Sequence, residues 1–321
     1  MHAVRTALFL ASLASATAIA AADDTAQSQL AQGRVDDAIN TLHGQISSSP
    51  NDPEAHNLLC RAYLTLGQWD RGISSCERAV TLEPNNSRYH LWLGRVYGEK
   101  ADKANFMTAA GLAKKVHTEF ETAVQLNPNN VDARADLAEF YLEAPGIVGG
   151  GREKAEAQAA TLATIDPAKA HWVNARIAEK KKDPETAEKQ YRAAIASSHG
   201  SAGAWLHLAQ FYKHVGRMAE MDDAIHQVAS APLDQADVLV DAAHLLLDTS
   251  RNLPEANLLL RRYVSSASTV EQAPAFKAHY LLGTVLERQG DNQGAAREYR
   301  AALTLAKSFS AAQEALNRVN R

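Results

Sequence analysis

Apolar and polar positions alternate with a helical period, and turn residues interrupt the pattern at regular intervals. Residues 53–86 show this most clearly. In their first half, apolar side chains recur every three or four positions until Gly67: Leu58, Leu59, Ala62, Tyr63 and Leu66. Residues 69–82 carry a second stripe, which ends before Pro84: Ile73, Cys76, Ala79 and Val80. Together they predict two amphipathic helices joined by a short turn.

This hairpin pattern repeats along the chain. Leu59 and Tyr63 recur 34 positions later as Leu93 and Tyr97. A shift of 44 then maps Tyr97 onto Tyr141. A period of this size indicates a stack of similar units rather than one or two globular domains.

At these positions the chain resembles the tetratricopeptide repeat family, most closely in residues 53–86 and 276–307. About eight units begin near residues 19 (partial), 53, 87, 131, 168, 202, 237 and 276, and Ser310–Arg321 has the pattern of a capping helix. The resemblance implies an all-α, right-handed superhelical solenoid over 23–321 with a concave inner face. It also implies that small residues mark close helix crossings, among them Gly94, Ala123, Ala138, Ala187 and Ala302.

Two neighbouring units, at about 87–130 and 131–167, are longer than the period. About ten extra residues fall in 101–111, where they either extend both helices or form a projecting loop. About five more fall in 144–151. Three glycines there precede Arg152, and their N–H groups could bind an anion at a helix N-terminus. The alternative is a plain hairpin turn; the candidate residues are Gly149, Gly150, Gly151 and Arg152.

Residues 1–22 have the layout of a secretory signal peptide. Arg5 precedes an uncharged apolar run, Thr6–Ala20, and small residues of the Ala-x-Ala type follow it. The run is about 15 residues, whereas a membrane span needs about 20. We therefore expect an exported protein, periplasmic or secreted, without membrane insertion after cleavage. The alternative is an uncleaved anchoring helix.

Composition narrows the function classes. Hydrophobic residues make up 46% of the 321 residues, aromatic residues only 6%, and the net charge is -4. Low aromatic content argues against a β-sandwich or barrel. Because the 33 basic residues are slightly outnumbered by 37 acidic ones, the overall charge does not predict nucleic acid as a partner.

The two cysteines, Cys60 and Cys76, lie in the two helices of one hairpin, 16 positions apart. In an oxidising compartment they could form a disulfide, which the loop-entropy relation values at ~3 kcal/mol. Two buried free thiols are the alternative, and it is slightly favoured because disulfide geometry is strict.

Motifs for catalysis and metal binding are missing from the sequence. It contains no Gly-x-Ser-x-Gly elbow, dinucleotide fingerprint or His-Glu-x-x-His pair. We predict no metal, no cofactor and no enzymatic activity.

The family register places several side chains of the first helices on the inner face. Arg61, Arg95 and Arg176 occupy equivalent positions and could bind carboxylates of an extended partner; ordinary solvation is the alternative. The candidate partner-binding set is Arg61, Arg95, Trp172, Arg176, Gln210, Lys213 and Tyr280. These residues predict a non-catalytic scaffold that binds a protein or peptide. The alternative is an enzyme, or a protein binding a small ligand or polysaccharide, with its site in the groove.

Overall fold

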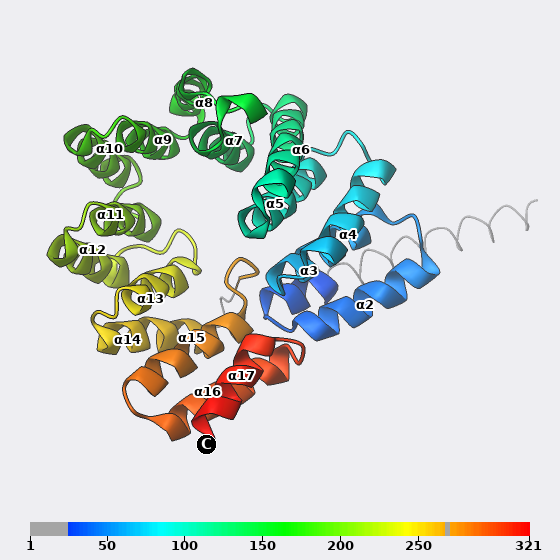
Figure 1. Cartoon of the computed structure of the whole chain (residues 1–321), viewed down its shortest axis with the longest axis vertical. Coiled ribbons are helices and arrows are strands. Elements are labelled where there is room, and N and C mark those ends of the chain that lie inside the picture. Colours follow the sequence, from blue (N-terminus) through cyan, green and yellow to red (C-terminus); the bar gives the residue numbers. More distant parts are fainter. Residues whose placement is uncertain (1–24, 267–269) are drawn as a thin grey trace, which may run out of the picture.

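The computed structural model describes residues 25–266 and 270–321, and these form helices and turns without a strand. Residues 25–31 are helical and precede α2 (Figure 1). The helices are α2 (Val35–Ser48), α3 (Pro53–Thr65), α4 (Trp69–Leu82), α5 (Ser87–Lys103), α6 (Phe106–Leu126), α7 (Val131–Glu143), η1 (Gly146–Val148), α8 (Arg152–Ile165), α9 (Pro167–Lys180), α10 (Pro184–Ser197), α11 (Ala202–His214), α12 (Met218–Ser230), α13 (Val238–Asp248), α14 (Leu253–Val264), α15 (Ala275–Arg288), α16 (Asn292–Leu305) and α17 (Ser310–Val319).

The predicted all-α stack of hairpins is confirmed. Several of the residues that break the periodic pattern also begin the next helix, because their side chains satisfy free N–H groups of its first turn. Asn130, for example, accepts a hydrogen bond from the N–H of Ala133 at 3.0 Å. Gly67, with φ of 69°, follows α3 in a left-handed conformation that suits glycine.

Small residues lie at helix crossings, as the resemblance implied. A Cβ atom on Gly94 in α5 would lie 2.4 Å from the ring of Phe120 in α6. A Cβ on Gly283 would lie 2.5 Å from Tyr299. Both distances are below any normal contact, so glycine permits the two helices of each hairpin to pack this closely.

Tyrosines connect successive hairpins. The hydroxyl of Tyr97 in α5 donates to Glu77 in α4 at 2.5 Å, and that of Tyr141 in α7 donates to Glu121 in α6 at 2.8 Å. Both pairs are 20 residues apart, so the bond recurs at equivalent places of two consecutive units. The rings therefore fill the space between hairpins while their hydroxyls remain hydrogen-bonded.

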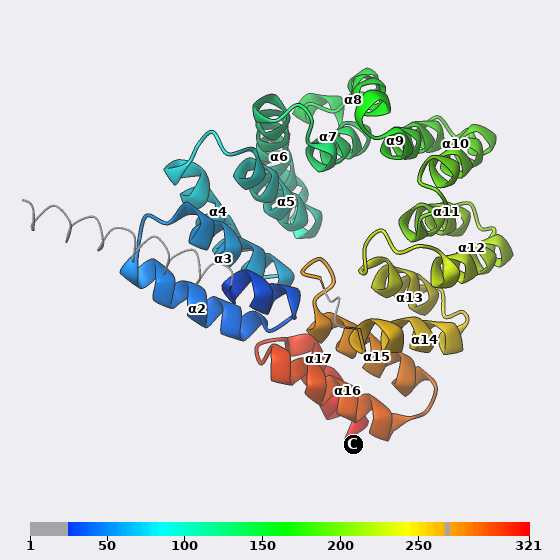
Figure 2. The same ribbon diagram turned by 180° about the vertical axis from the view of Figure 1, so that it is seen from behind.

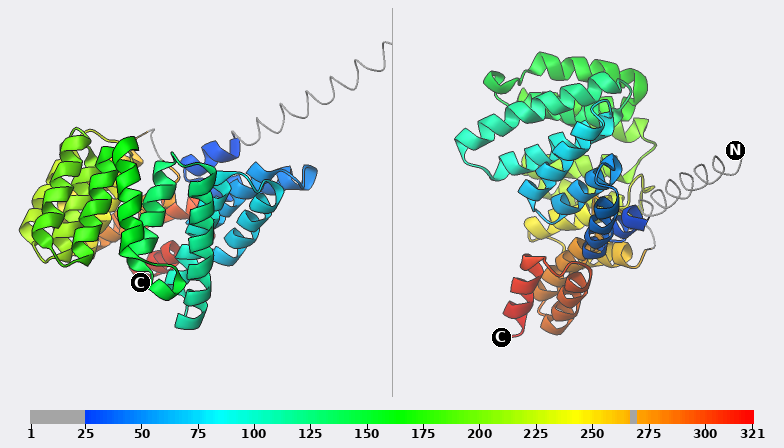
Figure 3. Two further views of the ribbon diagram at one scale, coloured as in Figure 1. Left: turned by 90° about the horizontal axis from the view of Figure 1, so that it is seen from above. Right: turned by 90° about the vertical axis from the view of Figure 1, so that its right-hand side faces the viewer.

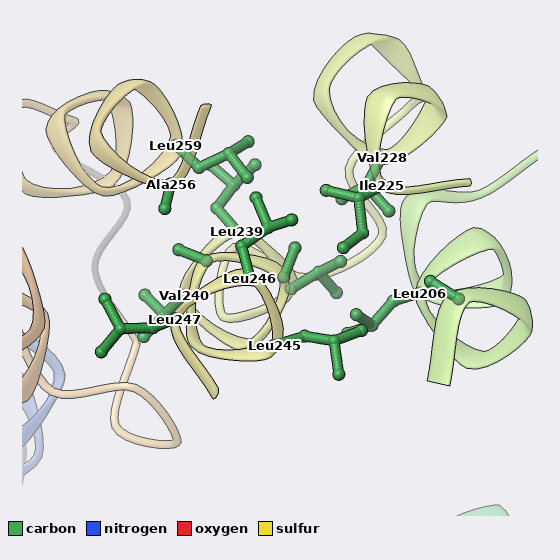
Figure 4. Close-up of a cluster of buried hydrophobic side chains, with 14 of the residues drawn as sticks. Leu206, Ile225, Val228, Leu239, Val240, Leu245, Leu246, Leu247, Ala256 and Leu259 are labelled. Atoms are coloured by element: carbon green, nitrogen blue, oxygen red, sulfur yellow. The ribbon is translucent and has the colours of Figure 1, made fainter. Parts of the chain in front are cut away.

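The hairpin α13–α14 belongs to the largest apolar core. Figure 4 shows Leu239 and Leu246 of α13 between Leu259 of α14 and Ile225 of α12. This unit, residues 237–271, departs most from the family pattern in sequence. Burial of these leucines nevertheless holds it in the stack.

The stack curves until its first helices contact its last ones (Figures 1 and 2). One apolar cluster joins Leu30, Leu42 and Leu58 to Phe276 and Ala312, and all five are buried. No pattern in the sequence predicts this contact between the ends. The two end faces, which an open solenoid leaves to solvent, cover each other here, and we call this contact the seam.

Polar contacts also cross the seam. The N–H of Lys307 donates to the carboxylate of Asp36 at 2.6 Å. At Gly33, a Cβ atom would lie 2.5 Å from the backbone nitrogen of Ala275. At Gly33 the two ends are therefore packed so closely that no side chain fits between their backbones.

The first insertion extends helices and does not form a loop. With 17 and 21 residues, α5 and α6 are longer than the other helices given above. Figure 3 shows their connected ends projecting beyond the neighbouring hairpins. The second insertion forms η1 and the glycine turn before α8.

Residues 1–22, interpreted above as a signal peptide, lie outside the described residues. Among the helices that the structure describes, none combines the length and apolar character needed to cross a bilayer.

Candidate functional site

The first helix of each hairpin lies on the inside of the ring. Figure 1 shows α3, α5, α7, α9, α11, α13 and α15 inside and their partner helices outside. All seven predicted partner-binding residues lie on these inner helices. Their availability to a partner depends on what each one contacts.

Arg61 is not available, because a carboxylate of the same chain already binds it. Its guanidinium forms a bidentate pair with Glu271, with Nε donating to Oε1 at 2.8 Å and Nη2 donating to Oε2. The side chains are only 9% and 8% exposed. The guanidinium also lies 4.9 Å from the centre of the Trp92 ring. Arg61 therefore holds Glu271 against α3 beside the seam, and its guanidinium is occupied within the chain.

Arg95 and Arg176 are also paired within the chain. Arg95 donates to Asp136 at 2.7 Å, and Arg176 contacts Glu139 and Glu179, each at 2.6 Å. Burial alone would lower the pKa of Arg176, but the two glutamates raise it above its usual value. Arg95 and Arg176 thus connect neighbouring repeats, and each already has a carboxylate of the chain as its partner.

The two aromatic candidates differ. Tyr280 packs against the rings of Phe309, at 5.3 Å, and Tyr299, at 5.8 Å, so it belongs to the core next to the seam. Trp172 packs against His207, with ring centres 5.5 Å apart. The two line a cavity of about 310 Å³ between α9 and α11. Burial lowers the pKa of His207 to about 3, which keeps its ring neutral at physiological pH.

Gln210 and Lys213 line a second and larger open space. A pocket of about 560 Å³ lies between α11 and α13, and we call it the inner pocket. Its lining residues are Gln210, Lys213, His214, Asp241, His244, Leu245 and Asp248. At its far side, Asp248 lies 3.3 Å from the Lys213 amine and 3.4 Å from the His244 ring.

Asp241 is the distinctive charge of this pocket. Its side chain faces open space, and its carboxylate forms no hydrogen bond or ion pair with the side chains that the structure describes. Desolvation and, to a lesser degree, Asp237 raise the pKa of Asp241 to about 6, while His244 partly offsets them. An exposed carboxylate with no ion pair in the chain can pair with a cationic group of a ligand.

Asp241, His244 and Asp248 were not among the residues predicted from the sequence. All three lie in the unit whose register departs most from the family pattern. The signal that could have found them is their spacing of three and four positions, which places them along one face of α13.

The glycine turn does not form an anion site. The N–H groups of Gly149, Gly150 and Gly151 donate to backbone carbonyls, at 3.1, 3.2 and 2.9 Å. The side chain of Arg152 lies near Glu153 and Glu156. The predicted anion loop is therefore a hairpin turn, because backbone acceptors already occupy the donors.

Cys60 and Cys76 form a disulfide between α3 and α4, and both are fully buried. Their Cα atoms are 5.2 Å apart. Of the two alternatives, the structure has the bridge and not the slightly favoured free thiols. The hairpin geometry brings the two positions within disulfide range.

No group of three or more metal-ligating side chains comes together within residues 25–266 and 270–321. The structure therefore offers no candidate metal centre in that part of the chain.

Comparison with known proteins concerns the repeats and the fold. Two models described as tetratricopeptide repeat match residues 29–96 and 240–318. No curated protein matches the chain in sequence.

Several solved structures are similar. PilW, a widely conserved type IV pilus biogenesis factor, has 14% identity and a TM-score of 0.50, and the matched region covers 66% of this chain and 93% of the PilW chain. A tetratricopeptide repeat protein from Parabacteroides merdae has 13% identity and a TM-score of 0.49, covering 95% and 100%. A thermophilic repeat protein of Thermus thermophilus has 19% identity and a TM-score of 0.49, covering 59% and 98%. At such identities, the likeness concerns the fold.

Proposed function

We propose that this chain, which belongs to the tetratricopeptide repeat family, is an exported, non-catalytic scaffold that binds a protein or peptide partner at its inner pocket. Repeats of this family serve as protein-interaction scaffolds. The observation that carries the assignment to this surface is the difference between its residues and the rest of the inner face. The arginines pair internally and Tyr280 is packed. Gln210, by contrast, faces a pocket of about 560 Å³, together with Lys213, which contacts Asp248, and with Asp241, which has no ion pair among the described side chains.

The chemistry of the inner pocket favours a charged, extended segment. Asp241 provides a carboxylate without a partner among the described side chains. A Lys or Arg of the ligand would relieve the cost of that charge. Gln210 can both donate and accept, as recognition of a peptide backbone requires.

Two features support export and a non-catalytic role. Export is supported by the signal-like residues 1–22 and by the buried disulfide, since disulfides persist mainly in oxidising compartments. The non-catalytic role is supported by the repeats, which in this family serve as interaction scaffolds.

The test begins with the mature chain, residues 23–321, crosslinked to its partner in an envelope extract. Affinity for the identified partner is then measured by calorimetry with Asp241→Lys and Lys213→Glu, and with Lys189→Glu on the outer helix α10 as the matched control. We expect at least about a tenfold loss for the two pocket variants, as for a central charged contact, and none for the control. Unchanged affinity in both pocket variants would exclude this pocket as the binding surface.

Export is tested separately. Residues 1–22 fused to a β-lactamase that lacks its own signal should confer ampicillin resistance, and replacing Leu10 and Leu13 by Arg should abolish it, because charges interrupt the apolar run. Resistance that survives the arginines would contradict an export signal.

A further inference from the structure

The two insertions meet around an apolar pocket. This pocket shares no lining residue with the inner pocket. The end of α5, the start of α6, the end of α7 and η1 enclose about 360 Å³. Small side chains leave this space open, among them Gly98, Ala101 and Ala109, while Phe140 and Val148 add apolar wall. Both insertions contribute to it, so the longer helices and the extra turn create one feature together.

Large apolar side chains stand exposed beside this pocket. Phe106, Met107 and Ile147 are 83%, 80% and 88% exposed, above every other large hydrophobic residue that the structure describes. Phe106 and Ile147 line the pocket. Contiguous exposed apolar surface is unfavourable in water and marks interaction sites in soluble proteins.

The helix start keeps two of these side chains exposed. Asn105 accepts a hydrogen bond from the N–H of Thr108 at 3.1 Å and thereby begins α6. Phe106 and Met107 are then the first two residues of α6, at the projecting end of the α5–α6 hairpin (Figure 3). Their exposure follows from a capped helix, not from a frayed end.

The charges at the pocket indicate the kind of partner. Its charged lining residues, Asp102 and Glu143, are both acidic. Glu143 already contacts Arg176 and Lys180. Asp102 makes no side-chain hydrogen bond or ion pair with the described residues, so it can pair with a cation of a partner.

We propose that this pocket, with the exposed Phe106 and Ile147 in its wall, binds a segment of a second protein that carries large apolar side chains next to a Lys or Arg. The apolar side chains enter the pocket, and the cation pairs with Asp102. This surface is separate from the inner pocket, so one chain can hold two partners at once.

A protein segment fits better than a membrane surface. A pocket with concave apolar walls matches individual side chains, as in recognition of an amphipathic helix by a groove. An anionic bilayer instead favours basic residues around apolar ones. Here the charged residues of the pocket are acidic.

The experiment selects peptides from a random phage-displayed library on the full mature chain. The probe variant is Phe106→Ser/Ile147→Ser, and Leu258→Ser, an exposed apolar residue of α14, is its matched control. The charge variant is Asp102→Lys, matched by Glu314→Lys on the exposed face of α17. Because all these side chains are exposed, unchanged circular dichroism and melting are expected for each variant.

We expect selected peptides to combine large apolar residues with Lys or Arg. The double variant and Asp102→Lys should each weaken their binding at least about tenfold, and the controls should not. Failure to enrich such peptides, or equal binding by the double variant, overturns the proposal. So does association with phosphatidylglycerol vesicles that depends on Phe106 and Ile147 while no peptide is selected. Variants of the inner pocket leave this binding unchanged, which separates the two proposals.

Discussion

Removing the carboxylate of Glu271 should destabilise the protein far more than an ordinary surface substitution. Glu271 and Arg61 are 210 residues apart and form a buried bidentate pair beside the seam. Glu271→Ala leaves the Arg61 guanidinium buried without its counter-charge. Breaking one side of a buried pair costs about 3–5 kcal/mol, because the remaining ion has lost its hydration and its partner.

Urea unfolding followed by tryptophan fluorescence provides the assay. Of the four tryptophans, Trp92 lies 4.9 Å from the Arg61 guanidinium and contributes the signal from this region. The matched control is Asp70→Ala, which removes the Asp70–Lys100 pair; Asp70 is 84% exposed. Pairs of that kind contribute about 0–1 kcal/mol. Small-angle scattering should show an increased radius of gyration for Glu271→Ala if the ends separate.

A double variant distinguishes desolvation from lost packing. In Arg61→Met/Glu271→Leu both charges are replaced by apolar side chains, and stability should return to within about 1 kcal/mol of the wild type. A loss for Glu271→Ala no larger than that for Asp70→Ala would refute the assignment of Arg61 and Glu271 as a buried structural pair.

Further predictions concern the disulfide, a helix crossing and acid stability. Replacing both Cys60 and Cys76 by Ala should lower the free energy of unfolding by ~3 kcal/mol, and reductant should destabilise the wild type but not the variant; equal sensitivity to reductant would count against the bridge. Gly94→Val should cost about 1–3 kcal/mol or more, since its side chain meets Phe120, whereas Gly98→Ala, with open space around it, should be neutral or stabilising in the same urea titration. The pKa of His207 is lowered to about 3 in the folded chain, so the unfolded chain binds the proton first, and stability is lost as pH falls from about 6.5 towards 3. His207→Gln should therefore lose less melting temperature than the wild type between pH 7 and 4, and parallel curves would contradict a buried neutral ring.

Much of the architecture follows from local sequence patterns. Helical periodicity, with Gly67 and the Asn and Pro residues of the turns, predicts where hairpins begin and end, because these residues act on their own neighbours through backbone conformation and capping. Equivalent positions across repeats also placed the candidate residues on the inner helices correctly.

The ion pairs between repeats differ in whether the sequence could have predicted them. Arg95–Asp136 and Arg176–Glu139 join neighbouring repeats at separations of 41 and 37, close to one period, so a search for opposite charges at that spacing could have found them. The same search does not reach Arg61 and Glu271. Their contact requires the whole ring between them.

What the sequence by itself determined is the unit: two helices, their crossing and their inner face. The tertiary structure decided how many units bring the ends together, which arginines are occupied, and that two insertions enclose one pocket. The physical reason is that each hairpin rotates slightly on the one before it, and these rotations add along the stack. No single repeat encodes their sum, yet that sum determines the seam and the surfaces left for partners.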